Sequence, residues 1–406
     1  MNVHIKEIEN KIDYEKARSG PPEDFPVLKP IPGGRYNRED FFALERDNVM
    51  RKSWVVAAFR QELPEPGQYK VFDKLGVPIF VVRGRDGVVR AFYNTCRHRG
   101  APVVRSKCGK AEVLRCAYHS WAYSLDGKLV SVPDLRDFPG LEKGEHGLIQ
   151  VPCTEWNHFI FINLDSNAPP LLEALGPVAT ELAFLKDANL RVLSKDDYHI
   201  RCNWKATVDA FNEVYHVNFI HAGTGGKHFD THASMNSLFP GGHSRMVTRK
   251  NTGAHSAYAR GADLWIDSIP KFCRDNVTAW SVFPNASVLV EGTGLTMQFI
   301  WPKSVREVDI EQVYMGADWG DEPRPKFWDS YIPLMDNVLR EDLDNLEPIQ
   351  ASLDSGAFKA VVVNYQERRI AWFHEQIDRC IGLAKVPEDL RVPQILDRYT
   401  EGPVSF

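Results

Sequence analysis

Two short segments decide the fold of this chain: Cys96-Arg97-His98 and, seventeen residues later, Cys116-Ala117-Tyr118-His119. Each segment offers one thiolate and one imidazole within three or four residues, so both side chains of a segment can reach the same ion or cluster. Each also follows a β-rich run and lies among turn-forming residues. The pattern therefore predicts two loop tips that hold a metal centre between them.

Two cysteines and two histidines form the ligand set of a Rieske 2Fe-2S cluster, whose imidazoles raise the reduction potential above that of an all-cysteine ferredoxin. Two alternatives use the same residues: a zinc site, or a chance combination of buried cysteines and surface histidines. Zinc fingers usually pair like with like in each half, whereas cysteine and histidine alternate here, which favours the iron–sulfur cluster. Arg97, Arg99 and Trp121 would supply hydrogen bonds and shielding, or would be ordinary surface and packing residues.

The sequence around these segments predicts a compact all-β domain over residues 48–165. Short β-rich runs, such as VPIFVVR at 77–83 and HFIFINLD at 158–165, alternate with turn signals such as Asp86-Gly87. Before this domain, residues 1–37 predict an irregular polar arm and residues 38–53 an amphipathic helix.

Composition excludes several classes of protein. The net charge of −5 over 406 residues argues against nucleic acid as a partner. No run of about 18 apolar residues predicts a membrane span, and the polar N-terminal stretch lacks the apolar segment of a secretory signal. The seven cysteines are scattered and odd in number, which predicts a cytoplasmic protein without a disulfide framework.

Residues 166–406 predict a larger domain of mixed helices and strands. Helices are expected over 206–219, 325–353 and 364–382, and strands over 278–317. The segment 224–260 is rich in Gly, His and Ser and predicts a long irregular loop.

A second metal site is indicated by Glu213, His216 and His221. On a helix, positions 213 and 216 share a face. Two histidines and one carboxylate on one side of an iron leave positions open for dioxygen and substrate. The third ligand must come from elsewhere, and the spacing alone does not choose among four acids: Glu341, Asp342, Asp344 and Glu347. His228, His232 and His243 compete for the histidine positions.

NTCRHRGAPVV at 94–104 and LRCAYHSWAYSLDGKL at 114–129 resemble the cluster loops of Rieske non-haem iron oxygenase large subunits, the aromatic ring-hydroxylating dioxygenase family. The resemblance implies an α+β fold, in which a small all-β Rieske domain joins a larger catalytic domain with a helix-grip-like antiparallel sheet. Residues 1–47 would form an arm and helix packed on the catalytic domain. The implied cofactors are a 2Fe-2S cluster and a mononuclear non-haem Fe(II).

The resemblance also assigns residues. Cys96, His98, Cys116 and His119 would hold the cluster, and His216, His221 and Asp342 the iron, because EDLDNLEPIQASL at 341–353 resembles the family's late motif. Glu213 would bridge to a cluster-ligating histidine of the neighbouring subunit. Relatives often carry Asp at this position and Asn where Asp209 stands. Cys108 has no partner in the loops, so the disulfide of respiratory Rieske proteins is not expected.

The implied activity is that of a terminal oxygenase. Electrons would come from a separate NAD(P)H-linked reductase or ferredoxin, since the chain carries no Gly-rich nucleotide fingerprint. The assembly would be a homotrimer, with or without small beta subunits. Aromatic ring hydroxylation is the first choice. N- or O-demethylation, or hydroxylation of a quaternary amine, is the alternative, and an electron carrier or zinc protein a remote one.

The substrate pocket would lie between the histidine-bearing helix and residues 225–300. Two sets of candidates contribute to it, apolar side chains and basic ones that could meet a substrate carboxylate. They are Phe211, Trp265, Met297 and Phe299, and Arg245, Arg249 and Arg260.

Overall fold

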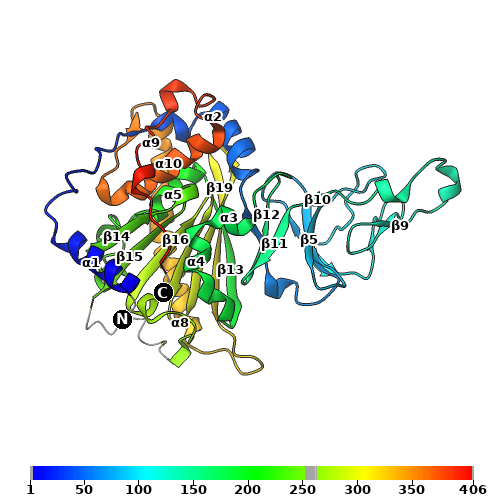
Figure 1. Cartoon of the computed structure of the whole chain (residues 1–406), viewed down its shortest axis with the longest axis horizontal. Coiled ribbons are helices and arrows are strands. Elements are labelled where there is room, and N and C mark those ends of the chain that lie inside the picture. Colours follow the sequence, from blue (N-terminus) through cyan, green and yellow to red (C-terminus); the bar gives the residue numbers. More distant parts are fainter. Residues whose placement is uncertain (1–2, 252–260, 262, 405–406) are drawn as a thin grey trace. The chain divides into compact units, whose positions relative to one another are not determined.

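The computed structural model describes residues 3–251, 261 and 263–404, which fall into two units (Figure 1). One unit is Met50–Leu171, and the other combines Met1–Val49 with Leu172–Phe406. The first unit is built from strands, whereas the second combines a large antiparallel sheet with helices. The predicted α+β fold class is confirmed.

The smaller unit contains three antiparallel sheets. A five-stranded sheet runs β10-β5-β4-β3-β6, and two three-stranded sheets run β11-β12-β2 and β7-β8-β9. The strands are β2 Val55–Phe59, β3 Gln68–Phe72, β4 Ile79–Arg83, β5 Val89–Tyr93, β6 Cys108–Lys110, β7 Leu114–Arg115, β8 Ala122–Tyr123, β9 Leu129–Ser131, β10 Gln150–Val151, β11 Cys153–Trp156 and β12 Phe159–Ile162. β12 is buried at every position, because β-branched and aromatic side chains fill the space on both sides of it.

The larger unit is organised around a seven-stranded antiparallel sheet of order β13-β19-β18-β17-β16-β15-β14. Its strands are β13 Leu190–Ile200, β14 Phe229–Leu238, β15 Ser244–Lys250, β16 Asn276–Val282, β17 Ala286–Glu291, β18 Gly294–Ser304 and β19 Glu307–Ala317. The helices are α1 Val3–Ala17, α2 Glu39–Glu45, α3 Leu171–Leu175, α4 Pro177–Glu181, α5 Trp204–Phe211, α6 Val217–Ile220, α7 Lys271–Asp275, α8 Trp328–Leu343, α9 Leu346–Asp354 and α10 Arg368–Ile381. A short pair, β1 Ile31–Pro32 and β20 Ala360–Val361, lies outside this sheet.

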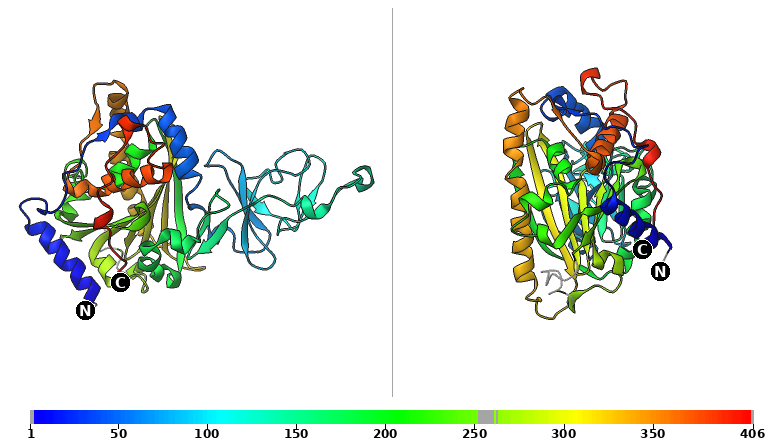
Figure 2. Two further views of the ribbon diagram at one scale, coloured as in Figure 1. Left: turned by 45° about the horizontal axis from the view of Figure 1, so that its top comes forward. Right: turned by 90° about the vertical axis from the view of Figure 1, so that its left-hand side faces the viewer.

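The two faces of the large sheet are covered by different helices. Helix α8 lies along one face (Figure 2), where Tyr314 of β19 packs against Tyr331 and Met335. On the opposite face, Arg245 and Trp280 both bond to Glu181 of α4, with N···O distances of 2.5 and 2.7 Å. Because side chains alternate along a strand, each strand contributes to both layers.

The N-terminal arm differs from the prediction, because α1 occupies Val3–Ala17. Ile8 and Ile12 are four residues apart and buried, and Glu15 follows on the same face. Glu15 accepts hydrogen bonds from Arg18 at 2.6 Å and from Arg368 at 3.2 Å. Tertiary packing therefore stabilises a helix whose composition is mostly polar.

The predicted loop over 224–260 is also wrong for the part that the structure describes. β14 and β15 pair with each other here, and residues 252–260 lie outside the described chain. Small polar side chains are buried in these strands because they find partners: Ser234 and Thr248 share a hydroxyl hydrogen bond of 2.8 Å, and Asn236 donates to the Gln366 carbonyl at 2.7 Å.

The expected helices exist but are shorter. The first one ends at Phe211, where the Asn212 N–H turns back to the Asp209 carbonyl, and α6 is a separate single turn. The helix expected over 325–353 is divided into α8 and α9. None of the helices in the described chain is long and apolar enough to cross a membrane.

Candidate active site

The two cysteine loops of the smaller unit have the same backbone hydrogen bonds. In each loop the cysteine N–H donates to the carbonyl five residues later, at 2.8 Å from Cys96 and 2.9 Å from Cys116. The N–H four residues after each cysteine donates back to the cysteine carbonyl at 2.9 Å. That position has a positive φ in both loops, 78° at Gly100 and 59° at Ser120. The two loops therefore share one backbone conformation.

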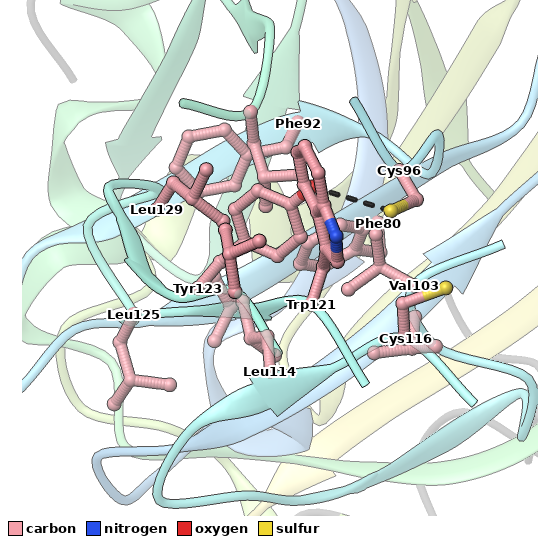
Figure 3. Close-up of a cluster of buried hydrophobic side chains, with 14 residues drawn as sticks. Phe80, Phe92, Cys96, Val103, Leu114, Cys116, Trp121, Tyr123, Leu125 and Leu129 are labelled. Carbon is pink, nitrogen blue, oxygen red and sulfur yellow. Dashed lines mark hydrogen bonds between the residues drawn. The ribbon is translucent and has the colours of Figure 1, made fainter. Parts of the chain in front are cut away.

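The four predicted cluster ligands are brought together at these loop tips. Cys96 and Cys116 are buried, and their sulfur atoms lie at one edge of the hydrophobic cluster (Figure 3). His98 is half-buried and His119 exposed, with ring centroids 4.7 Å apart. Two inner thiols and two outer imidazoles suit a two-iron cluster whose outer iron lies near solvent.

Tyr123 is a contributor to this site that the sequence did not point to. Its hydroxyl accepts from the Arg97 N–H at 2.9 Å and lies 3.2 Å from the Cys96 sulfur, so its own hydrogen is free to point at that sulfur (Figure 3). Trp121, for which the sequence left shielding and ordinary packing open, stacks on His98 with centroids 4.9 Å apart and planes within 9°.

The second site lies in the larger unit. His216, His221 and Asp342 present ligand atoms that all lie within 4.8 Å of one another, the one such group of three among the described residues. The Asp342 Oδ1 atom is 3.0 Å from His221 Nε2 and 3.4 Å from His216 Nε2. The donor set, two imidazole nitrogens and one carboxylate, suits a non-haem iron with open positions.

Glu213 and His216 reach this site from a turn rather than from the helix that we predicted. The helix stops at Phe211, and His216 opens α6 while His221 closes it. The Glu213 carboxylate contacts His216 Nδ1 and also accepts the His216 N–H at 3.2 Å. The Nδ1 proton is therefore fixed by Glu213, and Nε2 is left with its lone pair free for a metal.

The acids that compete for the third ligand position differ in their surroundings: Glu341 and Asp342 lie in the last turn of α8, whereas Glu347 lies in the first turn of α9. Asp342 faces the histidines, whereas Glu347 binds Arg201 at 2.7 Å at the surface. Glu341 lies behind His221, with its Oε2 atom 2.7 Å from Nδ1, and it also accepts from Thr224 at 2.8 Å. Glu341 thus fixes the Nδ1 proton of His221, as Glu213 fixes that of His216. Neither its spacing nor its charge distinguished it in the sequence.

Asp209, where relatives often carry Asn, belongs to a buried network rather than to the metal group. It accepts from the Tyr36 hydroxyl at 2.6 Å and lies 3.4 Å from His374 Nε2. His374 in turn accepts from Arg35 at 2.9 Å through Nδ1, and burial lowers the pKa of His374 to about 4. These groups connect α5 to α10 in the interior.

A cavity of about 180 Å³ opens beside the metal group, between α8 and the sheet. Its lining is mainly apolar with several uncharged polar side chains. The lining residues are Ala210, Phe211, Glu213, Val214, His216, Val217, His221, Gly225, Phe229, Thr231, Met246, Thr248, Val277, Ala279, Ser287, Leu289, Thr296, Gln298, Gln312, Met335, Val338, Leu339 and Asp342. The α8 members, Met335, Val338, Leu339 and Asp342, follow the i, i+3, i+4, i+7 pattern of one helix face, so one face both covers the sheet and carries Asp342.

Of the predicted lining residues only Phe211 faces this cavity. Met297 and Phe299 point to the opposite face of β18, and Trp265 packs against Arg274. Two of the candidate arginines are engaged elsewhere, Arg245 with Glu181 and Arg249 with Asp13 at 2.7 Å, and Arg260 lies outside the described residues.

None of the competing histidines joins the metal group. His243 is buried behind the sheet, donating to the Ala174 carbonyl at 2.9 Å and accepting the Phe283 N–H at 3.0 Å. His228 lies directly before β14, and His232 lies within that strand with its side chain exposed.

Comparison with known families agrees with both sites. A model described as Rieske [2Fe-2S] domain matches residues 53–151, and one described as ring hydroxylating alpha subunit, catalytic domain, matches residues 187–383. The chain belongs to the Rieske oxygenase large subunits. It is an oxidoreductase that incorporates oxygen from dioxygen, and its cofactors are a 2Fe-2S Rieske cluster and a mononuclear non-haem iron.

Individual relatives include choline and carnitine monooxygenases. The chain is 28% identical over 351 residues to a chloroplastic choline monooxygenase of Beta vulgaris, covering 84% of this chain and 73% of that protein. It is 34% identical over 196 residues to the carnitine monooxygenase oxygenase subunit of Escherichia coli, covering 48% of this chain and 52% of that subunit.

Solved Rieske oxygenases share the fold. A quaternary ammonium Rieske monooxygenase in complex with L-carnitine has a TM-score of 0.72 at 24% identity, covering 89% of this chain and 99% of that one. Naphthalene 1,2-dioxygenase from Rhodococcus sp. has a TM-score of 0.74 at 20% identity, covering 95% of this oxygenase and all of the other chain (100%).

Proposed function

We propose that this chain is the terminal component of a monooxygenase that oxidises an N-methylated quaternary amine, with electrons from a separate NAD(P)H-linked reductase or ferredoxin. The similarity to choline and carnitine monooxygenases supports this proposal. It favours the alternative substrate class over the aromatic hydroxylation that we predicted first. The chain spans about half the length of the carnitine relative that it matches.

In this proposal, separate sets of residues hold the two cofactors and orient the iron-binding histidines. Cys96, His98, Cys116 and His119 hold the cluster, and His216, His221 and Asp342 hold the mononuclear iron. When bound, that iron supplies the activation of dioxygen. Glu213 and Glu341 accept the Nδ1 protons of the two histidines and thereby fix each ring with Nε2 toward the metal.

The cavity supports the proposal through its shape and its lining. Phe211 and Phe229 offer aromatic surface to a methylated cation, and two carboxylates, Glu213 and Asp342, lie at the metal end. The apolar walls exclude water, while the Nε2 atoms and the Asp342 carboxylate stay turned inward. A methyl group on nitrogen could therefore approach the metal position with its cation facing the rings.

Aromatic ring hydroxylation is the second candidate, because most of the cavity wall is hydrocarbon. Val214, Met246, Leu289 and Leu339 would suit a ring without a charge. The chain is also 33% identical over 188 residues to a chlorobenzene dioxygenase subunit alpha of Cupriavidus sp., covering 45% of this chain and 42% of that subunit.

Turnover with a surrogate reductase separates these candidates. Holoenzyme with NADH would be given choline, carnitine and glycine betaine in one series and chlorobenzene and naphthalene in another, with oxygen uptake and product recorded. We expect coupled oxygen uptake with at least one amine. Turnover restricted to the aromatic compounds would contradict the proposal and establish the second candidate.

A further inference from the structure

Two glutamines lie side by side on the sheet face that forms the cavity wall. Gln298 of β18 is directly opposite Gln312 of β19 in the strand register, and both line the cavity. Paired positions in an antiparallel sheet have Cβ atoms about 5 Å apart, so the two amides can interact. Gln298 is 9% exposed and Gln312 only 1%, and theirs are the only amide side chains among the described lining residues.

The orientation of the Gln312 amide is fixed by its neighbours. The Asp336 Oδ1 atom can only accept, so the Tyr314 hydroxyl, 2.8 Å away, donates to it. The Tyr314 oxygen is then free to accept, and it receives the Gln312 Nε2–H at 2.8 Å. The carbonyl oxygen of Gln312 is therefore the atom left over, and within the described part of the chain it is buried without a hydrogen-bond partner.

An unpaired buried carbonyl oxygen needs a donor. If Gln298 turns an N–H to it, the Gln298 carbonyl faces the cavity instead. If Gln298 does not, a bound molecule must supply the donor to Gln312. In both arrangements the pair presents an amide carbonyl oxygen to the ligand.

The position of this acceptor relative to the metal follows from α8. Asp336, which anchors Tyr314, and Asp342 are on the same helix, six residues and therefore about 9 Å of axial rise apart. The acceptor thus meets a part of the ligand several atoms away from the carbon at the metal. The charged side chains among the described lining residues, apart from the two histidines, are the acids Glu213 and Asp342, so nothing in that lining pairs with a carboxylate.

We propose that the pair Gln298–Gln312 selects a substrate with an uncharged hydrogen-bond donor, such as a hydroxyl group, remote from the oxidised carbon, and disfavours a carboxylate at that place. This inference rests on the proposed function for its choice of amine substrates. The pair is a specificity determinant, and it takes no part in holding the metal.

The test is ligand binding to the anaerobic holoenzyme without a reductase, measured by calorimetry. The first probes are choline and its O-methyl ether, which differ in the hydroxyl hydrogen, and glycine betaine supplies the carboxylate. Benzyl alcohol and benzyl methyl ether form a second matched pair that does not depend on a cationic substrate. We expect the alcohol to bind about tenfold more tightly than the ether in the pair that binds, and glycine betaine to bind more weakly than choline.

Three variants assign the effect. In Gln312→Met and Gln298→Met the preference for the alcohol should fall towards one, because the acceptor or its relay is removed. Thr248→Val is the matched control, since Thr248 lines the same cavity but its hydroxyl is already bonded to Ser234. This variant should keep the preference. Circular dichroism and iron content show that each variant is folded and loaded.

The outcomes separate this inference from the proposed function. Binding of the benzyl pair alone, with the alcohol preferred through Gln312, would support the amide pair and contradict the amine substrate. Three results would overturn the inference. The wild type could bind alcohol and ether equally, both methionine variants could keep the preference for the alcohol, or no probe could bind.

Discussion

Glu341 is the residue whose role differs most from its appearance in the sequence. It was one of four equivalent acids, yet its carboxylate is 2.7 Å from His221 Nδ1. Carboxylates placed behind metal-binding histidines typically change metal affinity by about 10–100-fold. Glu341→Gln should therefore lower the affinity for iron by roughly that factor, because an amide can present N–H to Nδ1 and no longer fixes the proton there.

The matched control for that substitution is Glu347→Gln, which removes an acid of the same segment that binds Arg201 at the surface. Iron content after dialysis against a graded chelator measures the difference, and absorbance of the cluster shows that the other cofactor is intact. Equal iron retention in the two variants would contradict the role of Glu341.

At the residue scale, the sequence predicted the parts of the site that are close in the chain. The spacing of Glu213, His216 and His221 was enough to place them together, although the turn that presents them was not foreseen. The contribution of α8 required the fold, because acids at 341, 342, 344 and 347 differ only in the direction that each faces. Tyr123 and Gln312 carry no signal in the sequence, since the groups that give them their roles, the Cys96 loop and Asp336 of α8, are distant in the chain.

At the element scale, His243 connects the start of β15 to two other segments. One ring nitrogen donates to Ala174 and the other accepts from Phe283, so the ring must be neutral. Burial lowers the pKa of His243 to about 4, below the value of about 6.5 in an unfolded chain. Between these values the unfolded chain binds more protons, so the free energy of unfolding rises with pH in that window and is lost as the pH falls from about 6.5 to about 4.

The expected loss from this one histidine is at most about 3 kcal/mol across that window. His243→Gln keeps one donor and one acceptor but cannot titrate, so its stability should depend less on pH than that of the wild type. Urea unfolding at pH 5 and pH 7.5 compares the two proteins. His374, whose pKa is also lowered by burial to about 4, leaves a residual dependence in the variant. An unchanged slope in the variant would contradict the assignment.

Gly294 is required by the hairpin between β17 and β18. Its φ is +148°, and a Cβ atom there would overlap the Met315 backbone oxygen of the neighbouring strand. Gly294→Ala should cost about 3 kcal/mol or more, since both the backbone angle and the close approach are lost. Gly320→Ala is the control: its φ is +60° with nothing within 4 Å of the added atom, so the cost should be about 1 kcal/mol. Thermal unfolding of the two variants gives the comparison, and equal shifts would show that Gly294 is not special.

The elements that were predicted correctly can be recognised from their own residues alone. The strands over 276–317 are rich in β-branched and aromatic residues, either in alternation with polar residues or in continuous runs. β14 and β15 were missed because their buried positions carry Ser, Asn and Thr, which is tolerable only when other strands supply hydrogen bonds. On β18 the alternation predicted two faces but not which one met the cavity, so Met297 and Phe299 were chosen instead of Thr296 and Gln298.

At the scale of the whole molecule, we predict that one subunit's cluster serves the iron of the next. His98→Ala should eliminate the cluster and His221→Ala the mononuclear iron, so each variant alone should show no turnover. Oligomers formed by co-expression of the two variants contain intact pairs across subunit boundaries, and they should regain part of the wild-type rate. A mixture of the separately purified variants is the control. Co-assembled oligomers without activity would contradict transfer between subunits.

The division into two units explains why the sequence described the smaller one better. Its four predicted cluster ligands lie within 24 positions of one another, from Cys96 to His119, and the Cys/His pair occurs twice in that stretch of sequence. The larger unit packs α1, from the start of the sequence, against β14 and α10, from its middle and its end, through contacts such as Glu15 with Arg368. Contacts of that range have no local signature.

Because the chain breaks between α5 and α6, a metal ion bound by His216, His221 and Asp342 would also connect this turn to α8. The backbone hydrogen bonds of the turn that carries His216 and His221 are local, within residues 214–226, while Asp342 is fixed on a long helix that packs on the sheet. An ion that binds only when the turn and α8 are together adds stability by mass action, about 2.7 kcal/mol at a hundredfold excess over its dissociation constant.

Amide hydrogen exchange should therefore slow over residues 212–226 when iron or a redox-inert divalent ion is added, and quicken again with chelator. Exchange that is equally slow in the stripped protein would show that the turn is rigid without it. If the protection follows the metal, loss of iron in a cell would release this segment first, and the protein's lifetime would depend on its metal supply.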